Sequence, residues 1–243
     1  MNKTQKLALQ IFLPLTAIII LMIYQIPDSD LVQYMKFAST VALFIYALCI
    51  KTEGMTKLML KIAFLFSAIG DFFLAAMKAI DKNFDGSLYG IGLFLVAYIF
   101  LIIAFQKFGE GWKLNNLKKE LLILVPLLFI VGVFFVTMHQ YLGGIMIPIS
   151  ILFAITITYM TWTAITTLSR GWFKRAIAMM IAVAALLIFF SDFAVAYEIF
   201  LPAFDNPPAW IEALVRGTFT PAWTLLLVVL GDVKISENSE KNM

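Results

Sequence analysis

The stretch Ala63–Met77, AFLFSAIGDFFLAAM, contains thirteen apolar or small residues, one serine and a single carboxylate, Asp71. Such a run is suited to lipid or to a protein core, where an ionised carboxylate is costly. A second stretch, Leu187–Tyr197 (LIFFSDFAVAY), places Asp192 in the same kind of surroundings. Both stretches contain the pattern Asp-Phe-x-x-Ala. The rest of the sequence should therefore indicate why these two apolar segments each contain an acid.

The whole chain is as apolar as these stretches suggest. Of its 243 residues, 62% are hydrophobic and 14% are charged, and its mean hydropathy is +0.95. Soluble globular domains carry about 25% charged residues, so this chain has too little polar surface to cover a soluble core. We therefore expect an all-α polytopic membrane protein, a bundle of transmembrane helices forming one domain over residues 1–243.

Apolar runs long enough to cross a bilayer occur eight times. A hydrocarbon core of about 30 Å requires about 20 apolar residues per helix. The predicted spans lie near Leu7–Ile26, Leu31–Ile50, Leu58–Met77, Leu88–Gln106, Leu121–Met138, Gly144–Leu168, Ala176–Tyr197 and Ala209–Leu230. The polar tail 234–243 is expected to fray.

The basic residues are distributed unequally between the two sides of the predicted bundle. Fourteen of the eighteen lysines and arginines lie on the side of the termini, and only Lys78 and Lys82 lie on the other side. The loops on that other side carry acids instead, namely Asp28, Asp30, Asp81, Asp85 and Asp205. Because cytoplasmic loops are enriched in Lys and Arg, we expect a multi-pass protein of the cell membrane with both termini in the cytoplasm.

The two remaining basic residues, Lys36 and Arg216, lie inside predicted spans, as Asp71 and Asp192 do. A rise of about 1.5 Å per residue places all four in the outer half of the membrane. Charged residues in spans are costly, face the bundle interior or water, and are functional candidates by default. The sequence therefore predicts that these four charges line one shared polar cavity.

Two acids in one cavity indicate acid–base chemistry, in which one carboxyl is commonly kept neutral and the other ionised. The candidate catalytic residues are Asp71 and Asp192. Ser67 shares the face of Asp71 because it lies four residues earlier on the helix. The candidate substrate-binding residues are Lys36, Ser67, Tyr159, Ser191 and Arg216.

Each of these charges also has a structural interpretation. Asp71 and Asp192 could hold helices together through serine or backbone partners. Lys36 could extend its ammonium group to the outer interface, or act as a counter-ion or headgroup ligand. Glu212 lies four residues before Arg216 and offers an i,i+4 ion pair that would be structural.

Other polar and small residues in the spans have structural interpretations as well. Trp162 is expected to pack against neighbouring helices, whereas Tyr159 is open to either role. Glu198 is expected to be an interfacial residue. Gly90 and Gly92 begin a span, and we interpret them as helix-packing glycines.

The sequence offers little for a metal site. It contains a single histidine, His139, and a single cysteine, Cys49, so a zinc site built from His and Cys side chains is not expected. We expect no metal, no cofactor and no nucleic-acid partner.

Four stretches resemble the YhhN family of eight-span membrane proteins, which includes lysoplasmalogenases. The family's Gly-Asp and Ser-Asp motifs match Gly70–Asp71 and Ser191–Asp192. Phe37 stands where the family has a proline after the lysine of span two. The stretches are YMKFAST (34–40), FSAIGDFFLA (66–75), ITYMTW (157–162) and FFSDFAVAYEIF (189–200).

The resemblance implies that the chain hydrolyses the vinyl ether bond of a lysophospholipid, a lysoplasmalogen, to a fatty aldehyde and a glycerophospho-base. This chemistry needs a protonated acid and a second carboxylate but no metal, as in the two-carboxylate glycosidases. Asp71 and Asp192 would form the acid/base pair, with the proton assigned to neither. Lys36 and Arg216 would face the phosphate or tune the pair.

Other functions could use the same buried charges. A proton-coupled transporter also needs charged groups in its spans, although paired Gly/Pro interruptions are not evident here. A lipid-binding membrane protein would bind lysolipid and release no aldehyde. An intramembrane aspartyl protease typically carries Gly-x-Gly-Asp, whereas this chain has Ala68-Ile69-Gly70-Asp71. Aldehyde release without a gradient separates a hydrolase from the other functions.

Overall fold

The computed structural model describes residues 2–27, 29–51, 54–82, 84–106, 117–201 and 208–232. The predicted frayed tail 234–243, the loop acids Asp28 and Asp205, and the basic residues Lys107 and Lys113 lie outside these ranges. The elements are α1 (Lys3–Gln25), α2 (Asp30–Cys49), α3 (Met55–Asp71), η1 (Phe72–Ala76), α4 (Met77–Ile80), α5 (Ser87–Phe105), α6 (Leu117–Met138), α7 (Met146–Arg170), α8 (Arg175–Phe200) and α9 (Ala209–Leu230).

Within the described ranges, eight helices are long and apolar enough to cross a membrane, when α3, η1 and α4 are taken as one continuous span, Met55–Ile80. The all-α, eight-span prediction is therefore confirmed, and each predicted span corresponds to one helix. The first helix begins at Lys3 rather than near Leu7. The reason is a capping box, in which the side chains of Asn2 and Gln5 accept hydrogen bonds from each other's backbone N–H.

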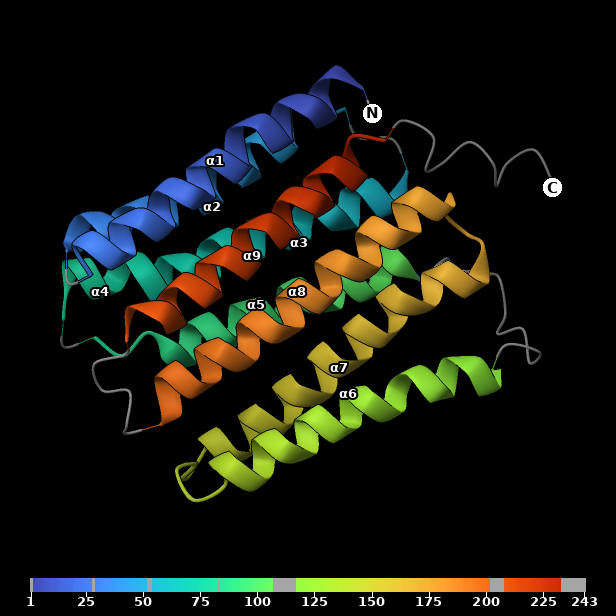
Figure 1. The fold of residues 1–243 in the computed structure, drawn as a ribbon. Coiled ribbons are helices and arrows are strands. Elements are labelled where there is room, and N and C mark those ends of the chain that lie inside the picture. The colour runs from blue at the N-terminus through green and yellow to red at the C-terminus, as the bar shows by residue number, and fades with distance from the viewer. Residues whose placement is uncertain are drawn as a thin grey trace.

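The last helix, α9, lies at the centre of the bundle (Figure 1). It packs against α1 and α8, and it is the most deeply buried of the eight spans. On either side, α3 packs against α5 and α7 against α8, while α6 lies at one edge and contacts mainly α7. The central position of α9 buries its Arg216 within the bundle.

Both described chain ends lie at the same end of the bundle. The side-chain amide of Asn2 donates to the carbonyl of Gly231 at 2.7 Å, and that of Gln5 donates to the carbonyl of Val228 at 2.9 Å. We call this the terminal end, and the other the cavity end.

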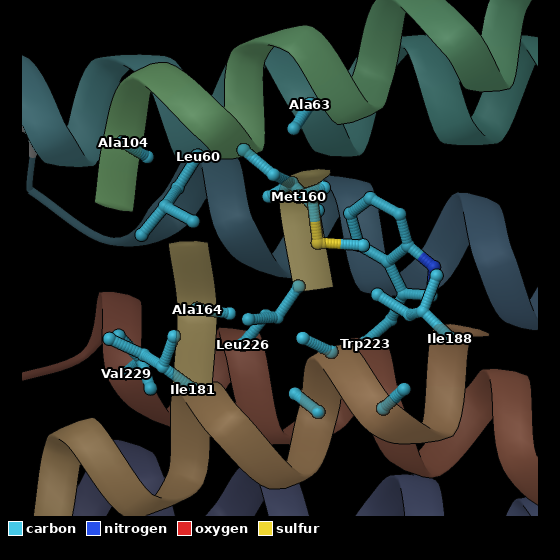
Figure 2. Close-up of a cluster of buried hydrophobic side chains, with 14 of the residues drawn as sticks. Leu60, Ala63, Ala104, Met160, Ala164, Ile181, Ile188, Trp223, Leu226 and Val229 are labelled. Carbon is cyan, nitrogen blue, oxygen red and sulfur yellow. The ribbon is translucent and has the colours of Figure 1, made fainter. Parts of the chain in front are cut away.

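The main hydrophobic core lies between the two ends, where α3, α5, α7, α8 and α9 meet (Figure 2). Alanines alternate with large side chains there, which lets the helices approach closely. The fully buried Trp223 packs edge-on against Phe64 with ring centroids 4.9 Å apart. The side chains labelled in Figure 2 are Leu60, Ala63, Ala104, Met160, Ala164, Ile181, Ile188, Trp223, Leu226 and Val229.

The third span widens into a π-helix, η1, directly after Asp71. The N–H of Met77 donates to the carbonyl of Phe72, five residues earlier. Such π-turns often occur at functional sites. The sequence did not reveal this feature, and the matching Asp-Phe-x-x-Ala pattern after Asp192 stays α-helical.

Two glycines allow α5 to pack directly on η1. A Cβ at Gly86 would lie 2.2 Å from the backbone oxygen of Phe73, and one at Gly90 would lie 2.5 Å from Cγ of Leu74. A Cβ at Gly92 would meet nothing within 4 Å. The predicted packing role is therefore confirmed for Gly90 and wrong for Gly92.

Candidate functional site

A polar cavity of about 140 Å³ opens at the cavity end of the bundle. By the measure of about 10–15 Å³ per water, it has room for several water molecules or a small polar group. Lys36, Asp71, Asp192 and Arg216 all line it, so the prediction that the four charges share one cavity is confirmed. Further polar lining residues include Gln33, Lys78, Ser150, Glu198 and Glu212.

Asp71 is fully engaged by donors, although only 3% of its surface is exposed. Arg216 of α9 donates from Nη2 to Oδ1 at 2.7 Å and from Nη1 to Oδ2 at 3.2 Å. The hydroxyl of Thr40 on α2 donates to Oδ2 at 2.8 Å. A bidentate guanidinium pair is among the strongest charge-assisted interactions, so Asp71 has both a cationic partner and a hydroxyl partner.

Asp192 lies in a different environment on α8. Its Oδ2 accepts a hydrogen bond from the hydroxyl of Tyr98 on α5 at 2.5 Å. No lysine or arginine in the described ranges forms an ion pair with it. The ring of Tyr98 is fully buried and packs against Phe94 and Phe153. The cavity therefore contains one acid held by a cation and one acid held by a neutral phenol.

Lys36 is buried and pairs with Glu212, whose Oε1 lies 2.7 Å from its Nζ. It also approaches Oε1 of Gln33 at 3.4 Å. Of the two interpretations of Lys36, the structure supports the counter-ion and not the interfacial position. The expected Glu212–Arg216 pair is wrong, because Glu212 faces α2 while Arg216 faces the buried carboxylate of Asp71 on α3.

The mouth of the cavity carries a looser ion pair. Nζ of Lys78 lies 3.5 Å from Oε1 of Glu198, and half of the Lys78 side chain is exposed. Asp85 lines the mouth as well. Hydrogen bonds from Ser87 lower the pKa of Asp85 below its ordinary value. The mouth of the cavity therefore contains one cation, Lys78, and two carboxylates, Glu198 and Asp85.

Apolar side chains also line the cavity. They include Phe134 of α6, Phe153, Ala154 and Ile157 of α7, and Phe193 of α8. Phe134 and Phe193 pack edge-on at 5.0 Å. A cavity lined by charged groups and by aromatic and aliphatic groups suits an amphiphilic molecule.

A comparison with protein-family models matches residues 31–231 to the YhhN family. The chain belongs to the YhhN family. The match includes both aspartates, and it confirms the resemblance noted in the sequence. Searches of curated proteins and of solved structures give no match.

Three of the predicted substrate-binding residues of this YhhN chain lie outside the cavity lining. Ser67 is fully buried, and its hydroxyl has no hydrogen-bond partner among the described residues. Ser191 donates to the carbonyl of Val215 at 3.3 Å. The hydroxyl of Tyr159 accepts from Nε2 of Gln106 at 2.6 Å.

Trp162 packs between helices, as the sequence predicted. It is buried, and its indole N–H donates to the carbonyl of Glu120 on α6 at 2.7 Å. Its ring lies beside that of Tyr159, with ring centroids 5.6 Å apart. The packing role of Trp162 is therefore confirmed.

Sequence reasoning missed two partners of the YhhN aspartates, Thr40 and Tyr98. Thr40 could have been found, because it lies four residues after Lys36 and therefore on the same helix face. Tyr98 is a single polar group in the apolar stretch LFLVAYIF, and such buried hydroxyls usually have a partner. Glu198 was expected at the interface, and the structure places it at the mouth of the cavity.

The donor set at this site consists of paired acids and bases. Across the described part of the YhhN chain, no group of three or more His, Cys, Asp and Glu side chains lies together as a metal site would require. The side chains present are suited to proton transfer and charge stabilisation.

Proposed function

We propose that the chain is a lysoplasmalogenase-like membrane hydrolase that cleaves the vinyl ether bond of lysoplasmalogens. The observation that carries this proposal is the contrast between the two acids, since Asp71 is paired with Arg216 and Asp192 is bonded to the neutral Tyr98 in one cavity. Membership of the YhhN family supports the reaction class, because that family includes lysoplasmalogenases.

The two acids divide the chemistry between them. Vinyl ether hydrolysis starts with protonation of the carbon β to the ether oxygen, which leaves an oxocarbenium ion. Asp192, with no cation beside it, supplies this proton. Asp71, paired with Arg216, acts as the carboxylate that stabilises the cation.

Water then adds to the oxocarbenium carbon and returns its proton to Asp192. The resulting hemiacetal collapses to a fatty aldehyde and a glycerol hydroxyl, so one water is consumed for each ether bond broken. The cavity has room for several water molecules, one of which would react.

The charged and the apolar lining residues suit the two parts of a lysolipid. The aromatic side chains of α6, α7 and α8 would hold the alkenyl chain, and the mouth would hold the headgroup. Lys36 and Arg216 are buried and each lie 2.7 Å from a carboxylate, whereas Lys78 is half exposed and lies 3.5 Å from Glu198, so Lys78 is better placed to meet the phosphate. Glu198 beside it would face the ammonium group of a choline or ethanolamine headgroup.

The distribution of basic residues also orients the proposed enzyme. With both termini in the cytoplasm, the cavity opens toward the outer leaflet. Cysteine-accessibility labelling at Lys78→Cys in intact cells tests this orientation, and labelling only after the membrane is permeabilised would reverse it.

Aldehyde release tests the function directly. The purified protein in detergent is incubated with choline and ethanolamine lysoplasmalogens, beside Asp71→Asn and Asp192→Asn. We expect release by the wild type and its loss in both variants, with Ser191→Ala as an active control because Ser191 lies outside the cavity lining. No release by the wild type would overturn the proposal and leave a transporter or a lipid-binding protein to be tested.

A further inference from the structure

A second hollow lies at the terminal end, where α1 begins, α2 ends, α3 begins and α9 ends. Among the described residues, its lining includes two lysines and no acid. The lining residues are Asn2, Thr4, Tyr46, Cys49, Ile50, Lys51, Lys57 and Gly231. Lys36 and Cys49 are separated by thirteen positions along α2, which corresponds to about 20 Å. This hollow is therefore separate from the site described above.

Lys57 is a lysine of this hollow whose side chain is almost completely buried. Only 3% of its surface is exposed, and its side chain forms no hydrogen bond or ion pair with any residue in the described ranges. A charged side chain that is mostly buried is stabilised by a partner of opposite charge. The neighbouring Lys61 differs, because its ammonium donates to the carbonyls of Leu48 and Ile50 at the end of α2.

The start of α3 adds a second feature that favours an anion. Its N-cap is Gly54, with φ 82°, and no side chain caps the helix. The first N–H groups of a helix lack intrahelical partners, and together with the helix dipole they bind anions. Lys57 is the third residue of this helix, so its ammonium group and the uncapped turn belong to the same element.

The polar groups around Lys57 are held in place. The hydroxyl of Tyr46 donates to the carbonyl of Thr4 at 2.9 Å, and the amide of Asn2 donates to the carbonyl of Gly231 at 2.7 Å. These hydrogen bonds connect the start of α1 with the ends of α2 and α9. A charged group entering the hollow would meet an ordered lining, which lowers the entropic cost of binding.

We propose that this hollow binds a phosphate group, with Lys57 as its principal ligand and Lys51 at its edge. The phosphate belongs either to the headgroup of an anionic lipid in the leaflet at the terminal end or to a soluble phosphate compound. The site is independent of the hydrolase activity proposed above.

Binding of two probes tests this site. One probe is inorganic phosphate, titrated into the protein in an uncharged detergent and followed by calorimetry and by the thermal unfolding midpoint. The other is a phosphatidylcholine nanodisc with or without phosphatidylglycerol, followed by the same unfolding midpoint. We expect Lys57→Gln to weaken binding about tenfold or more, as the loss of one charge-assisted hydrogen bond implies.

Three further variants make the result specific. Lys118→Gln removes an exposed lysine at the start of α6, away from the hollow, and should bind as the wild type does. Lys57→Arg retains the charge and should retain most of the binding. Lys51→Gln removes an exposed lining lysine, and it keeps the test available if Lys57→Gln does not fold.

The outcomes separate the two sources of phosphate. Binding of phosphatidylglycerol alone would assign the site to a lipid headgroup, and binding of inorganic phosphate alone would assign it to a soluble compound. Absence of binding by the wild type to both probes would overturn the proposal. Equal binding by Lys57→Gln and Lys118→Gln would overturn it as well.

Discussion

Arg216 and Asp71, which are 145 positions apart in the sequence, join α9 to α3 through two parallel hydrogen bonds. The guanidinium group also lies against the ring of Phe219, 5.5 Å from its centroid. This pair fixes the rotation of the central helix against the third span. The pair also gives Asp71, and not Asp192, a cationic partner.

Replacing Arg216 with Gln should destabilise the protein strongly. The variant leaves Asp71 buried without its cation, and breaking a buried ion pair in this way costs about 3–5 kcal/mol. Thermal or denaturant unfolding in detergent measures the loss. The double variant Arg216→Gln/Asp71→Asn should recover part of it, because neither charge is then left alone. Equal stability of Arg216→Gln and the wild type would show that the pair contributes little.

Replacing Tyr98 with Phe should affect activity more than stability. The ring still packs against Phe94 and Phe153, and one hydrogen bond contributes about 0.5–1.5 kcal/mol. Without the hydroxyl, Asp192 is no longer oriented toward the substrate. We expect kcat for aldehyde release to fall about tenfold, which corresponds to about 1.4 kcal/mol, with KM unchanged.

Tyr159→Phe is the matched control for this variant, because the hydroxyl of Tyr159 bonds to Gln106 outside the cavity lining. It should leave kcat unchanged. An equal fall in both variants would indicate a general effect of removing a tyrosine hydroxyl, and not a role for Tyr98 in positioning Asp192.

The sequence predicts the elements and the grouping of the four charges well, for a clear physical reason. The bilayer sets the length of an apolar run, and the fixed rise of a helix converts position in the run into depth. Lys36, Asp71, Asp192 and Arg216 could therefore be assigned to one cavity from the sequence alone. The family match over residues 31–231 covers both aspartates.

The sequence does not determine which charge pairs with which. Helical spacing allows Glu212 to pair with Arg216, and only the rotation of α9 against α2 and α3 sends them to Lys36 and Asp71 instead. The placement of Tyr98 beside Asp192 depends in the same way on how α5 faces α8. Partner choice is set by packing between helices, which a single sequence does not specify.

Replacing Lys78 with Gln should weaken substrate binding without unfolding the protein. The Lys78–Glu198 pair is half exposed, and such pairs contribute less than about 1 kcal/mol to stability. We expect KM for lysoplasmalogen to rise several-fold with kcat nearly unchanged, since the proposed role of Lys78 is to bind the headgroup and not the vinyl ether. Lys82→Gln removes an exposed lysine outside the cavity lining and should leave KM unchanged. A KM equal in both variants and the wild type would remove Lys78 from the headgroup site.

The two glycines of α5 provide a test of whether η1 positions Asp71. Gly90→Ala places a Cβ 2.5 Å from Leu74, and overpacking of this kind costs about 1–3 kcal/mol. Because η1 follows Asp71 directly, the displacement should also lower aldehyde release. Gly92→Ala meets nothing within 4 Å and should stabilise α5 by up to about 1 kcal/mol through helix propensity. Unfolding midpoints and kcat of the two variants, measured side by side, check both statements. If Gly90→Ala lowers the midpoint and leaves kcat unchanged, the contact between α5 and η1 is structural only, and Asp71 is held by Arg216 and Thr40 without it.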